Sequence, residues 1–295
     1  MINVGFCIAY DWNLLRYSLP LIYKEADRIC FSVDKDKISW SGNRYNWDEE
    51  GFRTLIDEFD TEGKITVLEE DYHLSELSPM ENEVRQRNLI AKFIGTKGWH
   101  IQLDTDEYFI DFPGFVKYLK SKHFSRPVNI CCPWITLFKK VDQGYLWIKN
   151  DDLDNQDIIA IATNSPEYQF GRRNGNFNIV TNYTLLHQSW ARESDEIAEK
   201  LKNWGHTNDF ELQNYFNFWK TLTEDNYQQI RDFHPIQEQR WQKLEFQEGR
   251  TIPYLINTFR ENPPIIFPRF KLWLLNSIWI SRARKLLNIM LRKIK

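Results

Sequence analysis

Asp104 and Asp106 are separated by one residue and are directly followed by Glu107. Carboxylates in such a cluster are suited to binding a divalent cation. These acids come after the apolar, β-prone run 99–103, so their carboxylates collect where a buried strand meets solvent. Oxygen ligands suit Mg²⁺ or Mn²⁺, and Mg²⁺ is commonly held by one or two carboxylates plus substrate phosphates. The alternative for the same residues is a solvated acidic turn.

A histidine, His187, ends a second β-type run over 182–187. At a strand end it can add a ligand beside the two aspartates, so the predicted metal ligands are Asp104, Asp106 and His187. The alternative is a histidine that makes only structural hydrogen bonds.

Charged side chains after these motifs are candidates for proton transfer and phosphate binding. Asp209 is the candidate general base, with Glu193 and Asp195 as rivals. Helix capping is the alternative role for these acids. A polar loop over 171–178 contains an Arg-Arg pair that could cover a phosphate.

The elements that must position these residues begin with residues 1–33, whose pattern predicts strand, helix and strand, a βαβ unit. In such sheets ligands bind beyond the carboxyl ends of the strands, where Tyr10, Asp11 and Asp34 would lie. Acids there can accept hydrogen bonds from a ribose or a base. A helix cap at Asp11 and a turn at Asp34 are the alternatives.

A long helix over 79–96 leads directly into the acidic strand. Glu83 and Arg87 lie four residues apart on it and share a face. Arg87 and Asn88 would therefore meet phosphates or orient the acids of the next strand, and a solvated Glu83–Arg87 ion pair is the alternative. The remaining predicted elements are helices over 48–59 and 111–122, strands over 64–68, 128–140, 144–149 and 158–162, and helices after His187 that continue to Lys220.

The composition of the chain limits the classes of protein to which it can belong. The 295 residues are 42% hydrophobic with 12 Trp, 13 Tyr and 20 Phe, which excludes a disordered chain and is compatible with aromatic faces that stack on sugars. The net charge of −3 gives no reason to expect nucleic acid as a partner. The 4 cysteines form no CxxC pair, so we expect buried thiols in a reducing cytosol. The N-terminus has no basic region and only a short apolar run before Asp11, which predicts a first strand and no signal peptide.

The C-terminal tail differs from the rest of the chain. Residues 262–295 contain no acid, while basic and apolar residues alternate along them. The nearly apolar run 272–280 is about half of the roughly 20 residues that span a bilayer. A helix lying on an anionic membrane surface is therefore predicted, and docking of its apolar side on the domain is the alternative.

These motifs together resemble bacterial glycosyltransferases of the GT-A fold. The likeness is to family 2 enzymes and relatives with a Leu-Asp-x-Asp-Glu-Phe signature, with Tyr108 where Phe is usual, and it covers about residues 1–220. The segments that carry it are the first βαβ unit, Arg87-Asn88, Leu103-Asp104-Thr105-Asp106-Glu107 and Leu186-His187-Gln188-Ser189-Trp190-Ala191-Arg192. The resemblance implies an α/β fold with a mixed, Rossmann-like sheet flanked by helices. It implies a GT-A domain over 1–222. After this domain we predict a helical extension over 223–262, and the composition predicts a basic amphipathic, membrane-associating tail over 263–295.

The resemblance also implies roles for the acids and for His187. Asp106 would ligate Mn²⁺ or Mg²⁺ at the donor diphosphate, Asp104 would face the ribose or the metal through water, and Glu107 would lie nearby. His187 would be a metal or phosphate contact, and Asp11 and Asp34 would meet the nucleoside. No clear match exists for the acid pair that supplies the base in many such enzymes, so Asp209 remains a candidate.

The resulting expectation is a metal-dependent glycosyltransferase that acts in the cytoplasm at the inner face of the cell membrane. It would move a sugar from a nucleotide-sugar, with UDP favoured, to a glycan or glycolipid such as a lipid-linked or surface polysaccharide. One alternative is a non-catalytic, membrane-docked scaffold on the same fold. Another is a sugar-phosphate nucleotidyltransferase, although no Gly- and Lys-rich phosphate loop stands near Tyr10.

Overall fold

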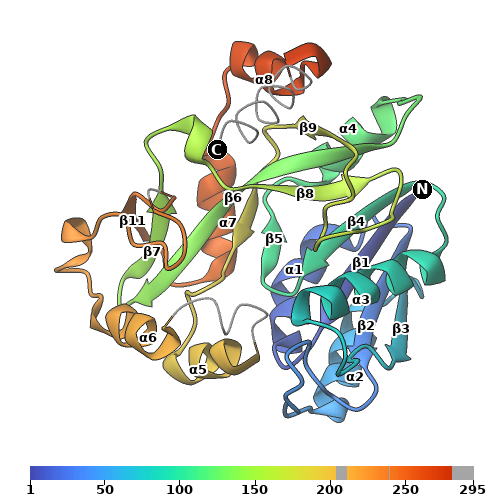
Figure 1. The fold of residues 1–295 in the computed structure, drawn as a ribbon, viewed down its shortest axis with the longest axis horizontal. Coiled ribbons are helices and arrows are strands. Elements are labelled where there is room, and N and C mark those ends of the chain that lie inside the picture. The colour runs from blue at the N-terminus through green and yellow to red at the C-terminus, as the bar shows by residue number, and fades with distance from the viewer. Residues whose placement is uncertain (204–210, 239, 281–295) are drawn as a thin grey trace.

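The computed structural model describes residues 1–203, 211–238 and 240–280 (Figure 1). One half of its central sheet is parallel, in the order β3-β2-β1-β4. These strands are β1 (Ile2–Ile8), β2 (Arg28–Asp34), β3 (Ile65–Glu70) and β4 (Trp99–Asp104). Since parallel strands end at the same edge, Asp34 and Asp104 both lie at the carboxyl edge of the sheet.

Helices cover both faces of this parallel half. They are α1 (Leu15–Ile22), α2 (Glu49–Phe59), α3 (Pro79–Ile94) and α4 (Phe112–Ser121). Phe6 of β1 packs with the apolar side chains of α1, α2 and α4, whereas its neighbour Cys7 packs on Ile90 of α3. Successive side chains of a strand point to opposite faces, which is why β1 is buried throughout and, apart from Asn3, carries no polar side chain.

The other half of the sheet is largely antiparallel and continues from β4 through β8, β6 and β7 to β11. These strands are β6 (Val128–Val141), β7 (Gly144–Lys149), β8 (Ile158–Thr163) and β11 (Lys243–Glu248). Short strands β5 (Glu107–Phe109), β9 (Phe177–Val180) and β10 (Leu185–His187) branch from it: β10 pairs with β5 and β6, and β9 with β6. The helices of this half are α5 (Ser194–Asn203), α6 (Leu212–Thr221), α7 (Ile252–Glu261) and α8 (Arg269–Asn276). Single 3₁₀ turns lie at Trp12–Leu14, Leu153–Asn155 and Tyr227–Gln229.

The predicted α/β fold, with a mixed sheet flanked by helices, is confirmed. The expected buried thiols are also confirmed, because all four cysteines are buried and free. Among the helices of the described residues, none combines the length and the apolarity needed to cross a membrane.

The acids lie at a strand end as predicted, because β4 ends at Asp104, the chain turns at Thr105 and Asp106, and β5 leaves the parallel sheet to pair with β10. Two local predictions need correction. The basic loop over 171–178 runs into β9, which begins at Phe177. The extension over 223–262 is helical only in part, because Lys243–Glu248 alternates polar and apolar residues and adds strand β11 beside β7. The extension thus shares its sheet with the preceding residues.

Candidate functional site

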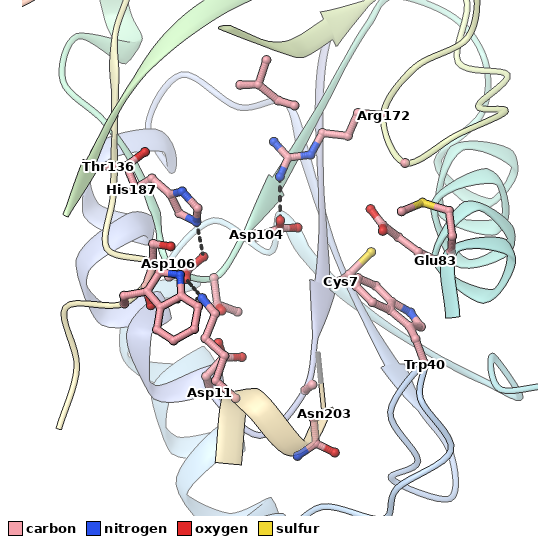
Figure 2. A pocket seen from close by; sticks show the side chains of 18 of the residues that line it. Cys7, Asp11, Trp40, Glu83, Asp104, Asp106, Thr136, Arg172, His187 and Asn203 are labelled. Carbon is pink, nitrogen blue, oxygen red and sulfur yellow. Dashed lines mark hydrogen bonds and ion pairs between the residues drawn. The ribbon is translucent and has the colours of Figure 1, made fainter. Parts of the chain in front are cut away.

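The two predicted motifs meet because of the pairing of β5 with β10. This antiparallel pairing places His187 opposite Glu107, and the backbone amide of Gln188 donates to the carbonyl of Asp106 at 2.9 Å. The His187 Nε2 atom then lies 3.7 Å from Oδ1 of Asp106. Figure 2 shows these two side chains facing one another, with Asp104 and Arg172 beside them.

A pocket of about 480 Å³ opens at this edge of the sheet. The predicted site residues that line it are Tyr10, Asp11, Asp34, Arg87, Asp104, Asp106 and His187. Residues at the ends of β1, β2, β4 and β10 therefore share one cavity, as expected for ligand binding at the carboxyl ends of parallel strands.

Asp104 is held by two arginines. Its Oδ1 accepts from Nη2 of Arg87 at 2.8 Å, and its Oδ2 accepts from Nη2 of Arg172 at 2.6 Å. Burial alone would raise the pKa of Asp104, but the two guanidinium groups lower it to about 2. Arg87 also pairs with Glu83 at 2.9 Å, so of the two roles predicted for Arg87 the structure has it orienting the acid.

Asp106 is held by a second pair of cations. Its Oδ2 accepts from Nη2 of Arg192 at 2.5 Å and from Nζ of Lys200 at 3.0 Å. Arg192 also pairs with Asp11 at 2.9 Å and so ties the end of β1 to this acid. Burial opposes ionisation, but Lys200 and Arg192 hold the pKa of Asp106 well below its usual range.

His187 is neutral at physiological pH. Burial lowers its pKa to about 4, although Asp106 acts in the opposite direction. Its ring packs against Trp134, with ring centroids 4.4 Å apart. Its Nδ1 has no hydrogen-bond partner among the described residues. A neutral imidazole is the form that ligates metals.

The side chains of Asp106 and His187 are suited to ligating a metal ion. Oδ1 of Asp106 accepts no hydrogen bond from Arg192 or Lys200, which both donate to Oδ2, and Nε2 of His187 faces Oδ1. Asp104 does not complete the set, since arginines occupy both of its oxygens. Within the described part of the chain, no group of three or more His, Cys, Asp or Glu side chains could hold a metal ion. A divalent cation would thus depend on substrate phosphates for further ligands.

Several other predicted site residues have structural partners. Both oxygens of Asp34 accept backbone N–H groups, from Asp36 and Ile38 on one side and from Tyr72 and His73 on the other. Its side chain therefore lines the pocket but fixes two loops there. Such an acid satisfies the backbone of the loops around it.

Asn88 and Glu107 lie outside the lining of the pocket. The amide of Asn88 exchanges two hydrogen bonds with the backbone of Tyr168 and holds the loop that carries Arg172. Glu107 is fully buried and accepts from the Asp104 amide and from Arg172. Burial raises its pKa to about 7, against the effect of Arg172.

The candidate bases are not brought into the pocket. Glu193 is exposed and pairs with Lys140 at 2.7 Å, and Asp195, in the first turn of α5, is also exposed. Neither of them is among the residues that line the pocket. Asp209 lies outside the described residues.

The sequence prediction missed Arg192 and Lys200 as ion-pair partners of Asp106. Arg192 stands in the motif around His187, which was the available signal. Lys200 is on α5, and no spacing rule links it to an acid 94 positions earlier in the chain. Arg172 was anticipated only as part of a basic loop.

Comparison with known proteins leaves the family open. No family model matches the sequence, and no curated protein matches it. Among solved structures, HddC from Yersinia pseudotuberculosis is similar with 11% identity and a TM-score of 0.35, covering 63% of this chain and 92% of that one. The inositol-1-phosphate CTP transferase from T. maritima has 9% identity and a TM-score of 0.34, covering 69% and 96%. A 4-diphosphocytidyl-2C-methyl-D-erythritol synthase from Anaerococcus prevotii has 13% identity and a TM-score of 0.29, covering 89% and 96%. Similarity at this level assigns neither a family nor an activity, so the resemblance to family 2 glycosyltransferases stays a prediction.

Proposed function

We propose that the protein is a glycosyltransferase that takes a sugar from a nucleotide-sugar and passes it to a glycan or glycolipid acceptor. The observation that carries the proposal is the convergence of Asp104, Asp106 and His187 in one pocket at the ends of β1, β2 and β4. A pocket of this kind suits a nucleotide at the strand ends with its diphosphate near the acids.

The cations around the acids support a diphosphate as ligand. Arg172 and Lys200 each line the pocket within hydrogen-bonding distance of one of the aspartates. Guanidinium and ammonium groups also bind phosphate oxygens, so the two side chains can contact both the acids and the donor. Tyr10 and Asp11 would face the nucleoside, for which UDP is our favoured carrier.

Asp106 and His187 would hold Mn²⁺ or Mg²⁺ when the donor is bound. Such a cation neutralises the charge that appears on the departing nucleoside diphosphate. Asp104 would act indirectly, since it keeps Arg87 and Arg172 in place.

The transfer breaks the bond between the anomeric carbon and the diphosphate oxygen and forms a bond from that carbon to an acceptor hydroxyl. The nucleoside diphosphate leaves, and the hydroxyl proton passes to a base, for which Asp209 remains our candidate. Trp134, Phe170 and Trp241 also line the pocket. Aromatic rings pack on the apolar faces of sugars, which supports a glycan acceptor.

Nucleotidyl transfer is the second candidate, in which a sugar phosphate attacks a nucleoside triphosphate and pyrophosphate leaves. Two of the similar structures, a CTP transferase and a diphosphocytidyl synthase, are named for nucleotidyl transfer. The residues after β1 are Ala9-Tyr10-Asp11-Trp12-Asn13, with neither the Gly nor the Lys of a triphosphate-binding loop.

Product analysis separates these candidates. The protein is incubated with Mn²⁺ and either nucleotide-sugars or nucleoside triphosphates with sugar 1-phosphates, and released nucleoside diphosphate and pyrophosphate are measured. We expect nucleoside diphosphate release from nucleotide-sugars, abolished in Asp106→Asn. Pyrophosphate release would establish nucleotidyl transfer instead, and activity unchanged in Asp106→Asn would contradict both.

A further inference from the structure

The last described helix, α8, is attached to the body of the protein along one side. Leu272 and Leu275 pack against the apolar cluster formed by α7 and the sheet. The side chain of Asn276 accepts from the amide of Val180 at 2.7 Å and donates to its carbonyl at 2.9 Å. Figure 1 shows α8 at the top of the molecule beside β9, with α2 and α5 at the bottom. The orientation of α8 is therefore fixed by β9.

The outer side of α8 and its flanks expose large apolar side chains. Phe270 is 69% exposed and Trp273 is 61% exposed, and their rings stack with centroids 6.0 Å apart. Ile266 before the helix is 58% exposed and Trp279 after it is 75% exposed. Four large apolar residues exposed within one short segment form a patch, and such patches on soluble domains mark interaction surfaces.

The charge of this segment identifies its partner. Residues 262–295 contain no acid. Their basic residues are Arg269 and Lys271 on α8, of which Lys271 pairs with Asp154, and, outside the described residues, Arg282, Arg284, Lys285, Arg292, Lys293 and Lys295. The whole chain has a net charge of −3, so the cations are concentrated here. A second copy of the chain would bring the same cations to the contact, and like charges repel. An anionic lipid surface complements them.

Aromatic and basic side chains together are typical of protein segments that bind at a membrane interface. Trp and Phe settle at the boundary between headgroups and acyl chains, while Lys and Arg contact lipid phosphates. We propose that α8 docks on an anionic membrane surface, with Phe270 and Trp273 entering the interface. This inference rests on α8 and not on the pocket, so it stands independently of the proposed function.

The test is cosedimentation of the full chain with phosphatidylcholine vesicles, with or without about one third phosphatidylglycerol. We expect binding to the anionic vesicles that weakens with salt, because exposed charges are screened beyond roughly 10 Å at 0.1 M salt. The double variant Phe270→Ser, Trp273→Ser should bind at least about tenfold more weakly, since two apolar side chains no longer enter the interface. Phe93→Ser is the matched control, because Phe93 is 50% exposed on α3.

Three results would overturn the proposal. Failure to bind anionic vesicles at low salt would remove the membrane as partner. Equal binding by the double variant would remove α8 from the contact. A stable dimer that the double variant dissociates would make a second copy the partner. Unchanged thermal unfolding of the double variant would show that it is folded.

Discussion

Replacing Arg172 by Met tests whether this side chain holds the acids of the site together. Arg172 is 6% exposed, and its Nη2 donates to Asp104 at 2.6 Å and to Glu107 at 2.8 Å. Removing one partner of a buried ion pair costs about 3–5 kcal/mol. Asp104 keeps Arg87, and Glu107, whose pKa burial raises to about 7, can take up a proton near neutral pH. We therefore expect the free energy of unfolding to fall by about 3 kcal/mol, at the lower end of that range.

Urea unfolding at pH 7, followed by tryptophan fluorescence, measures this loss. Arg173→Met is the matched control, because Arg173 is the exposed neighbour of Arg172 and a surface substitution changes stability by about 0.5 kcal/mol or less. In a Glu107→Gln background the same Arg172→Met change should cost less, since one of the two charges that Arg172 compensates is absent. A loss below about 1 kcal/mol, or a loss that Glu107→Gln leaves unchanged, would refute the role assigned to Arg172.

Three further stability predictions use the same unfolding assay. Gly5→Ala should destabilise by about 1–3 kcal/mol, because the added Cβ would lie 2.6 Å from Cγ2 of Ile90; a neutral effect would mean that α3 can move away. Ser78→Ala should cost about 1 kcal/mol, because Ser78 and Glu81 form the capping box of α3, and no loss would show that the cap contributes nothing. Asp34→Asn should cost about 1–3 kcal/mol, because one of its two accepting oxygens is replaced by a donor; unchanged stability would contradict its role in fixing the two loops.

The fold was predictable because its parallel half depends on local patterns. Nearly continuous apolar runs such as 2–8 can be buried only between two layers of helices, and a glycine such as Gly95 marks where α3 ends. Strand β11 was missed because a six-residue alternating segment at a sheet edge gives a weak signal. The break between β4 and β5 follows from the pairing of β5 with β10, a contact between distant segments that no local pattern contains.

The acids of the site were predictable and their cations were not. Asp104 and Asp106 stand out because a strand end carries them, and His187 because it ends another strand. Arg192 and Lys200 reach Asp106 only through the path of the chain after β10, where Ser189 takes a positive φ of 45° and α5 begins five residues later. The composition of a single segment does not encode such a contact.

The most direct test of the central claim is nucleotide binding that depends on metal and on Asp106. Thermal unfolding is measured with UDP, GDP, CDP or dTDP, each with and without Mn²⁺, for the wild type, Asp106→Asn and the control Glu193→Gln, whose side chain lies outside the pocket. A ligand at 100 times its Kd stabilises the folded state by about 2.7 kcal/mol, which is readily detected. We predict stabilisation by one nucleoside diphosphate only with Mn²⁺, retained in Glu193→Gln and lost in Asp106→Asn. If no nucleotide stabilises the protein with Mn²⁺ present, or if Asp106→Asn responds like the wild type, the proposed donor site is contradicted.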